Sequence, residues 1–273
     1  MWIRKKHIKK LSQDIRKKID GQPIELRDHV EGPLGILKND IHTLLYRKEQ
    51  QLSALKQDQR QMMDTLVNIS HQIKTPLTSM MLMADLLEDA PSHDRDTFLA
   101  NMKGGLLRME WFATALLKMA KLDGGVVDFE METIPFRQLV EKALESLQIL
   151  LDIKGQHITL AGEDDFTCDI SWTREALGNV IKNAMEASPE GATIHIACGK
   201  NPICRWIAVT DQGPGIDKAT RAKLFTRFGG SGQEGSYGIG LALALGVMHR
   251  QNGDIAVDPG GDGVGATFTL KFF

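Results

Sequence analysis

The sequence has few cysteines, no excess of either charge and no long apolar run. Its three cysteines, among 273 residues, show no zinc-site spacing, which excludes a disulfide framework and fits a reducing compartment. Thirty-three Lys and Arg against 35 Asp and Glu leave a net charge of −2, so bulk charge gives no reason to expect nucleic-acid binding. Because no run reaches about 18 apolar residues, we expect neither a membrane span nor a signal peptide here. The absence of GxxxxGK(S/T) excludes a P-loop enzyme.

Basic residues are concentrated near the N-terminus. Eight of them lie between Met1 and Ile19, where Asp14 is the single acid. Such a cluster is typical of a segment at the cytoplasmic face of a membrane, beside a span outside this sequence. A solvated basic helix end is an equally good interpretation. We take residues 1–49 as a basic juxtamembrane linker.

Two long helices are predicted next, each with one apolar stripe. The first carries a heptad pattern over residues 45–80 and the second over residues 99–120, with a turn at 90–92 and a glycine end at 124–125. A single hairpin buries such stripes poorly, whereas two hairpins from two chains form a four-helix bundle. Residues 50–124 are therefore predicted to form a homodimeric helical hairpin.

The remaining residues, 125–273, are predicted to form an α/β sandwich, which makes the fold class α+β. Short β-rich runs alternate with helical stretches. The expected strands are 157–160, 193–197, 205–210, 255–257 and 266–272, and the expected helices are 135–151, 172–188 and 240–251.

One histidine of the first helix is unusually placed. His71 falls at an outward-facing position of the heptad pattern, and Pro76 follows one turn later inside the helix. A proline there removes a helical hydrogen bond to Gln72 and typically costs about 3 kcal/mol. A lone surface histidine usually has no role, but a distortion beside it predicts a shaped site.

A second group of polar residues is predicted to serve a nucleotide. Glu175, Asn179 and Asn183 are spaced i, i+4 and i+8, so they share one helix face that suits magnesium bridging to phosphates; an ordinary solvated face is the alternative. Asp211 follows a predicted strand beside a glycine turn and is placed to accept a hydrogen bond from an adenine amino group. Six glycines between 229 and 240 lead into a helix start, which predicts a phosphate cradle.

The run from Ser70 to Leu77 resembles the phosphoacceptor box of sensor histidine kinases of two-component systems. The resemblance implies that His71 accepts a phosphoryl group and that Thr75 holds the water that hydrolyses the phosphorylated regulator. Gln72 replaces the usual Glu or Asp; an amide can orient the imidazole but is a poor base.

The C-terminal half resembles the ATP-binding domain of the GHKL superfamily. The matching boxes are 179–183, 211–215, 225–228, 238–241 and 265–268, in the family's order. The resemblance implies that Asn183 binds magnesium, that Asn179 supports the triphosphate, that Asp211 reads adenine and that Glu175 serves proton transfer or organises metal and water. It also makes residues 225–235 a mobile ATP lid. The other implied ATP-binding residues are Lys182, Gly213, Gly215, Ile216, Phe225, Arg227, Phe228, Gly238, Ile239, Gly240, Leu241 and Thr267.

Two positions depart from the GHKL pattern. The family often has a Lys-Tyr pair where this chain has Glu186 and Ala187, and the basic residue that often follows the third box is replaced by Gly230. Phosphate contacts are then expected from Lys182 or Arg227.

Together these features predict the cytoplasmic part of a sensor histidine kinase that uses ATP and Mg²⁺ to phosphorylate His71 and then an aspartate of a response regulator. The expected partners are a second copy and a receiver domain, without nucleic acid, and with membrane attachment through a segment absent from this chain. Residues 8–44 weakly resemble a HAMP-like signal relay, although a plain helical linker is favoured. The alternatives are a regulator phosphatase, a non-catalytic dimeric scaffold, and an ATPase clamp of the chaperone or mismatch-repair kind, which would not need the exposed histidine.

Overall fold

The structure is a computed structural model that describes residues 5–19, 33–89, 91–229, 238–261 and 265–273. It divides into two units, residues 1–69 and 70–273, and each is described by itself. No helix in the described ranges is both long and apolar enough to cross a membrane.

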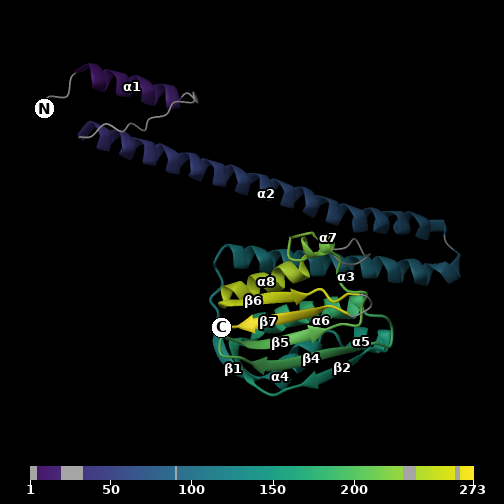
Figure 1. The fold of residues 1–273 in the computed structure, drawn as a ribbon. Coiled ribbons are helices and arrows are strands. Elements are labelled where there is room, and N and C mark those ends of the chain that lie inside the picture. Colours follow the sequence, from purple (N-terminus) through teal and green to yellow (C-terminus); the bar gives the residue numbers. More distant parts are fainter. Residues whose placement is uncertain (1–4, 20–32, 90, 230–237, 262–264) are drawn as a thin grey trace. The chain divides into compact units, whose positions relative to one another are not determined.

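Three helices make up the N-terminal part of the chain (Figure 1): α1 (Lys5–Ile19), α2 (Pro33–Asp89) and α3 (Ser92–Asp123). Helix α2 is 57 residues long and begins well before the stretch predicted from its apolar pattern. Its first turns mix apolar residues with Gly35, Asn39 and Asp40, which are poor helix formers, so the local sequence gives only a weak helix signal there. Pro76 lies inside α2 without ending it.

The end of α3 is the one that the two glycines predict. The backbone N–H of Gly124 donates to the carbonyl of Ala120 at 3.0 Å, and Gly125 adopts a φ of +65°. That left-handed backbone conformation is easily reached only without a side chain, and it turns the chain out of the helix.

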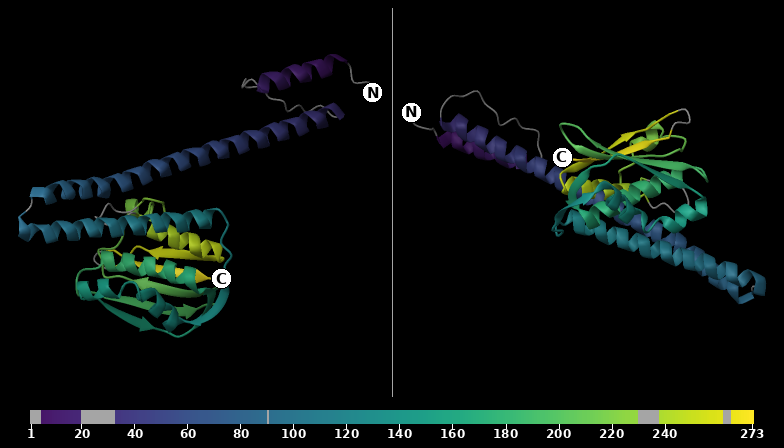
Figure 2. Two further views of the ribbon diagram at one scale, coloured as in Figure 1. Left: turned by 180° about the vertical axis from the view of Figure 1, so that it is seen from behind. Right: turned by 90° about the horizontal axis from the view of Figure 1, so that it is seen from below.

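The described residues between 131 and 273 form a mixed sheet covered by helices (Figure 2). This confirms the predicted α+β fold class. The five-stranded sheet has the order β2-β4-β5-β7-β6, in which only β2 and β4 are parallel, and β1 pairs antiparallel with β3 in a separate two-stranded sheet. The strands are β1 (Met131–Pro135), β2 (His157–Ala161), β3 (Asp165–Asp169), β4 (Thr193–Lys200), β5 (Arg205–Thr210), β6 (Gly253–Asp258) and β7 (Thr267–Phe272).

The helices of this domain are α4 (Phe136–Leu144), α5 (Gln148–Lys154), α6 (Ile170–Ala187), α7 (Lys218–Arg221) and α8 (Gly240–Arg250). Two sequence predictions are corrected. The single helix expected over 135–151 is two helices, and no glycine or proline marks the break at 145–147. Strands β1 and β3 were not predicted, because both are short and β1 buries only Ile134.

The core lies between the five-stranded sheet and a layer of three helices. Helix α6 contacts α4 on one side and α8 on the other, and it also contacts β4 and β5. Its inner face is fully buried, and the sheet supplies matching β-branched and aromatic residues. The largest completely buried side chains of the domain include Phe136, Phe166, Leu177, Ile181, Met185, Ile194, Ile207 and Phe268.

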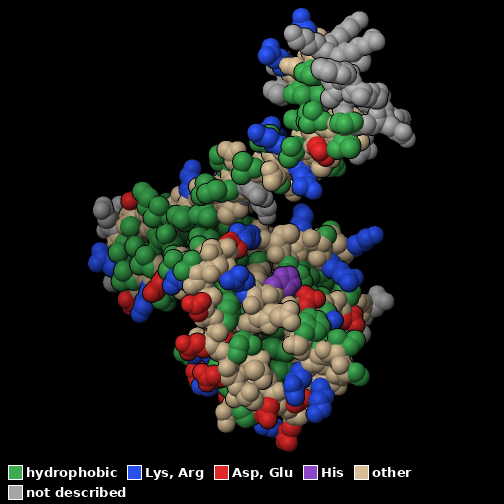
Figure 3. Space-filling view, turned by 90° about the vertical axis from the view of Figure 1, so that its left-hand side faces the viewer, with side chains coloured by type: hydrophobic (Ala, Val, Ile, Leu, Met, Phe, Trp, Pro, Cys, Tyr) green, Lys and Arg blue, Asp and Glu red, His purple; other side chains and the backbone are tan. Residues whose placement is uncertain are grey.

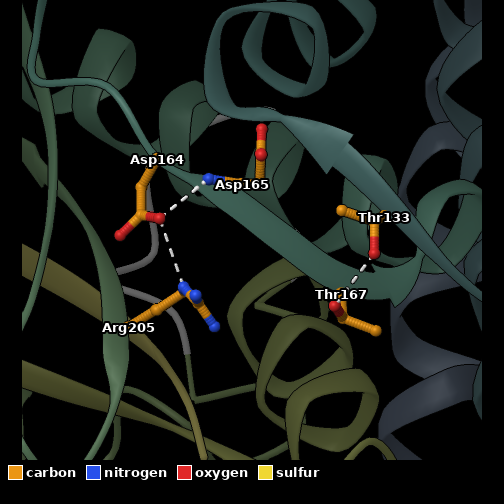
Figure 4. Close-up of polar contacts among 5 residues, drawn as sticks. All are labelled: Thr133, Asp164, Asp165, Thr167 and Arg205. Carbon is orange, nitrogen blue, oxygen red and sulfur yellow. Dashed lines mark hydrogen bonds and ion pairs between the residues drawn. The ribbon is translucent and has the colours of Figure 1, made fainter.

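Polar contacts attach the two-stranded sheet (Figure 4). The hydroxyls of Thr133 and Thr167 lie 3.1 Å apart across β1 and β3. Asp164 accepts from the backbone of Asp165 and from Nε of Arg205, which begins β5, at 2.9 and 3.2 Å. The ion pair therefore ties the small sheet to the large one.

Asp169 joins three elements at the start of α6. Its Oδ1 accepts from the backbone N–H of Trp172 at 2.9 Å, which is an N-cap bond, and its Oδ2 accepts from the backbone of Glu130 at 3.0 Å. Its own backbone N–H donates to Gln251 at the end of α8. One buried carboxylate thus fixes the approach of β1, the start of α6 and the end of β3.

Replacing Asp169 by Ala should lower the free energy of unfolding of this domain by about 2 kcal/mol, because an N-cap bond and a second, part-buried hydrogen bond are both lost. Urea unfolding followed by tryptophan fluorescence measures the change, since Trp172 and Trp206 lie in the domain. Asp165→Ala, at an exposed position of the same strand, is the control and should change stability by less than about 0.5 kcal/mol. Equal effects of the two substitutions would contradict the assigned role of Asp169.

Candidate functional site

The predicted phosphoacceptor, His71, is exposed on the surface of α2. Gln72 beside it is half-buried, and the hydroxyl of Thr75 donates to the backbone carbonyl of His71 at 3.2 Å. Pro76 has no N–H to donate to the carbonyl of Gln72. The imidazole is therefore accessible to an incoming reactant on a well-formed helix.

A cavity of about 280 Å³ opens between α6, the start of α8 and the loop that follows β5. It gathers residues from four of the predicted boxes, which are distant in the sequence. Its described lining is Trp111, Asn179, Lys182, Asn183, Glu186, Ala187, Asp211, Pro214, Gly215, Ile216, Asp217, Thr220, Leu224, Gly229, Gly238, Gly240, Leu241, Ala266 and Phe268.

Asp211 is held in the cavity wall by two backbone donors. Its Oδ1 accepts from the N–H groups of Gly213 and Ala266 at 2.8 and 3.0 Å. Among the described residues no donor to Oδ2 is found, so this second oxygen is available to a ligand in the cavity. Burial raises the pKa of the carboxyl, and the two backbone hydrogen bonds oppose that rise.

Two glycines are required for this geometry. A Cβ atom on Gly265 would lie 1.9 Å from the carbonyl oxygen of Asp211, and one on Gly240 would lie 2.7 Å from Oδ1 of Asn179. The first glycine lets β7 approach Asp211, and the second lets the start of α8 approach α6. A side chain at Gly265 would meet backbone atoms and push the walls of the cavity apart, whereas one at Gly240 would displace the side chain of Asn179.

Helix α6 places only part of its predicted polar stripe in this cavity. Asn179 and Asn183 both line it, and Lys182 lies between them. Asn179 also donates to the backbone carbonyl of Glu175 at 2.9 Å. Glu175 itself lines a neighbouring cavity and forms an ion pair with Lys118 of α3 at 2.8 Å.

The third box lies at the rim of the cavity. Phe225 and Phe228 are half-buried, and the backbone N–H of Phe228 donates to the carbonyl of Gly238 at 3.0 Å. Arg227 forms an ion pair with Asp123 at the end of α3 at 2.7 Å. The predicted lid residues 230–235 lie outside the described residues.

Three predicted residues have supporting positions instead of lining ones. Ile239 is completely buried before the first turn of α8, and Gly213 contributes its backbone N–H to Asp211. Thr267 pairs its hydroxyl with that of Thr210 at 2.9 Å across β7 and β5. Its neighbours Ala266 and Phe268 line the cavity in its place, because successive residues of a strand face opposite sides.

Sequence reasoning missed several lining residues, and Trp111 is the most distant of them. This side chain comes from α3, outside the predicted ATP-binding domain, and nothing in its own segment indicates a ligand. Glu186 was noted only as a departure from the family. Asp217, Thr220 and Leu224 lie in or beside the short helix α7, and they could have been suspected only from their position between two boxes.

The cavity fits a nucleotide that brings its metal ion with its phosphates. Magnesium prefers oxygen ligands and usually keeps water and substrate phosphates among them. Asn183 offers one amide oxygen in the cavity, with Asn179 beside it. Within the described ranges no group of three His, Cys, Asp or Glu side chains could hold a metal without a nucleotide.

Two family matches cover these two parts of the chain. Residues 61–125 match the His Kinase A phosphoacceptor domain, HisKA, which includes His71. Residues 168–273 match HATPase_c, described as the histidine kinase-, DNA gyrase B- and HSP90-like ATPase, which includes the cavity except for Trp111.

Similar proteins are found among relatives and solved structures. The heme sensor protein HssS of Staphylococcus saprophyticus is 29% identical over 86% of this chain, and the chain spans 52% of that protein's length, about half. The histidine kinase AdeS of Acinetobacter baumannii has the same fold, with a TM-score of 0.62 at 21% identity, over 74% of this chain and 96% of that one.

A crystal structure of histidine kinase ThkA in complex with response regulator protein TrrA also has a TM-score of 0.62, at 17% identity, over 83% of this chain and 64% of that one. The HisKA match, the HATPase_c match that follows it in the chain and the similarity to HssS all indicate the same protein family. The chain belongs to the sensor histidine kinases of two-component systems.

Proposed function

We propose that the chain is a protein histidine kinase that transfers the γ-phosphoryl group of ATP to His71 and from there to an aspartate of a response regulator. The observation that carries this proposal is the presence, in one chain, of an exposed histidine on a HisKA helix and a cavity with an open carboxylate oxygen in an ATPase domain. Either feature alone would fit a scaffold or a simple ATPase.

The cavity residues have separable roles in this proposal. Oδ2 of Asp211 accepts a hydrogen bond from the adenine amino group, and the glycine turn at Gly213 and Gly215 lets the flat ring lie against the backbone. Lys182 and the amides of Asn179 and Asn183 face the phosphates. Magnesium, when bound with ATP, would neutralise phosphate charge near Asn183. Positioning and charge neutralisation are the main contributions that a protein makes to such a transfer.

The neutral imidazole of His71 is the nucleophile in this proposal. One ring nitrogen uses its lone pair to attack the γ-phosphorus, and ADP leaves. The amide of Gln72 can accept a hydrogen bond from the other ring nitrogen and so orient the ring, but it cannot take the proton as a carboxylate does. Among the described residues lining the cavity His71 does not occur, so transfer requires the nucleotide and the histidine to move together.

Regulator dephosphorylation is the second candidate activity. Gln72 and Thr75 both lie beside His71, and Thr75 keeps an acceptor lone pair while it donates to the helix backbone. A water molecule held by these two groups would be placed to attack a phosphoaspartate. In this alternative the nucleotide domain binds ATP without phosphorylating His71.

We infer that a second copy of the chain covers the apolar stripe of the hairpin. Hydrophobic side chains occupy much of the visible surface of the helical segments (Figure 3). Some of the exposed large apolar side chains of α2 and α3 fall on the predicted heptad seam and others lie beside it, and this much apolar surface is unusual for an isolated helix pair. The exposed seam residues include Leu52, Leu55, Met62, Leu66 and Ile73 of α2, and Leu99 and Leu106 of α3.

We further propose the division into residues 1–49, 50–124 and 125–273 as linker, phosphoacceptor hairpin and ATP-binding domain. Helix α1 presents Lys9, Lys10, Arg16 and Lys17 within a single short helix. This charge favours the anionic inner surface of a cell membrane, where the native protein would be held.

Dimerisation through the hairpin can be tested on one leucine. Leu106→Glu should weaken self-association by at least about 10-fold, because the two-fold axis places the charge twice in an apolar core. Sedimentation equilibrium gives the dissociation constant. Asn101→Glu adds the same charge to the opposite, exposed face of α3 and should leave the constant unchanged. A Leu106→Glu protein that associates as tightly as the parent would show that the seam lies elsewhere.

His71→Gln should abolish incorporation of label from γ-labelled ATP while leaving ATP affinity intact. The label on the parent should be acid-labile and alkali-stable, as expected of a phosphoramidate. His42→Gln, another histidine on α2, is the matched control and should label normally. Normal labelling of His71→Gln would refute the acceptor assignment, and ATP binding without any label on the parent would favour the phosphatase or scaffold.

Asp211→Asn should weaken ATP binding by about 10- to 100-fold, because an amide NH₂ would then face the adenine amino group. The raised pKa of Asp211 has a further consequence. Parent affinity should fall as the pH drops through the raised pKa, since the protonated oxygen no longer accepts, whereas this step should be absent in the variant. Titration calorimetry at a series of pH values from 7 downward measures both.

The folding stability of the parent should depend on pH in the opposite sense to its ATP affinity. A raised folded-state pKa favours the neutral carboxyl, so its stabilising contribution is present at low pH and is lost as the pH rises through that pKa. The uncharged Asp211→Asn variant, with its amide oxygen still accepting from both backbone groups, should not show this loss. Urea unfolding of both proteins over the same pH range measures this stability. It also shows whether Asp211→Asn binds ATP weakly only because it has unfolded.

A further inference from the structure

Helix α3 has a second apolar face besides the predicted dimer seam. Phe112, Ala115, Met119 and Leu122 are spaced as one helical stripe, and each is less than 10% exposed. The residues that cover this stripe belong to the ATP-binding domain. Helix α3 contacts α8, where Leu122 lies against Gly246, and Phe112 lies beside Phe228 with ring centroids 6.4 Å apart.

Two contacts reach from the same side of α3 to α6. The ammonium of Lys182 lies over the indole ring of Trp111, 4.7 Å from its centroid, and Lys118 pairs with Glu175 at 2.8 Å. Trp111 and Lys118 are seven residues apart on α3, and Lys182 and Glu175 are seven apart in the reverse direction on α6. Both pairs therefore span about 10 Å along their helices and fix one antiparallel register.

Lys182 is the only Lys or Arg among the described residues that line the nucleotide cavity. Its side chain has four rotatable bonds and two neighbours that can hold its charge. One is the face of Trp111, and the other is the carboxylate of Glu186, one turn further along α6 at 3.7 Å. The ammonium makes both contacts in the same conformation. Glu186 partly neutralises its charge toward a phosphate, whereas the face of Trp111 attracts the ammonium and leaves its hydrogens available.

We propose that Trp111 is a positioning residue of the nucleotide site, which holds the ammonium of Lys182 toward the phosphates of the bound nucleotide. The phosphoacceptor hairpin thus supplies part of the site in which the ATP-binding domain holds its substrate, and triphosphate affinity depends on the register between α3 and α6. This inference rests on the proposed function, because it takes the cavity to be the ATP site.

A purely structural role for Trp111 makes a different prediction. Trp111 is itself part of the cavity wall, so truncation could loosen the wall for every ligand alike. Positioning of Lys182 concerns the phosphates only. The ratio of ATP affinity to adenosine affinity therefore separates the two roles. Calorimetry is the suitable method, because a fluorescence assay would lose part of its signal when Trp111 is replaced.

The experiment measures ATP and adenosine binding to the full chain and to Trp111→Ala, Trp111→Phe, Lys182→Met and the Ala/Met double variant. Trp111→Ala should weaken ATP binding roughly 3- to 10-fold and leave adenosine binding unchanged. Trp111→Phe should retain most of the ATP affinity, since a phenylalanine ring also attracts a cation. In the Lys182→Met background, Trp111→Ala should have no further effect on ATP. Leu117→Ala, at an exposed position of α3, should change neither affinity.

Equal losses of ATP and adenosine affinity in Trp111→Ala would overturn the proposal in favour of a wall residue. Tighter ATP binding by that variant would overturn it too, because α3 would then be obstructing the site. Additive losses in the double variant would show that Trp111 does not act through Lys182. A parent protein that binds neither ligand would instead refute the proposed function itself.

Discussion

Helix α6 must bury most of its surface and still keep one polar stripe open, and the C-terminal domain is organised around that requirement. Its inner face packs between α4, α8 and the central strands. Its start is fixed by the carboxylate of Asp169. At its other end, Gln156 donates to carbonyls at Met185 and Ser188. With both ends satisfied and the inner face buried, Asn179 and Asn183 project from a rigid support into the cavity.

The cavity is made by close backbone approaches as much as by side chains. Asp211 is a buried carboxylate whose desolvation is offset by two backbone donors, and those donors reach it only because glycines occupy the neighbouring positions. The same approaches leave one carboxylate oxygen open. A selective hydrogen-bond acceptor therefore results from the packing of strand ends against α6, with no dedicated loop of charged residues.

Helix α3 belongs to both parts of the molecule. One stripe carries the exposed seam residues that a second copy is proposed to cover, and the other is buried against the ATP-binding domain. The contacts of the second stripe are mixed, with apolar packing at Phe112 and Leu122 and charged pairs at Lys118 and Asp123. Mixed interfaces of this kind are typical of domains that separate and rejoin, because few of their groups are costly to expose to water.

The sequence by itself determined the elements whose chemistry is local. The heptad stripes, the glycine end of α3, the strands with alternating burial and the boxes around Asn179, Asp211 and Gly240 all follow from short-range patterns, and the exposure of His71 follows from its heptad position. Only the tertiary structure decided which residues meet. Strands β1 and β3 form because they pair with each other, which no local pattern records. Trp111 reaches Lys182, and Lys118 reaches Glu175, across more than fifty residues of sequence, since contacts between distant segments depend on how two finished helices pack.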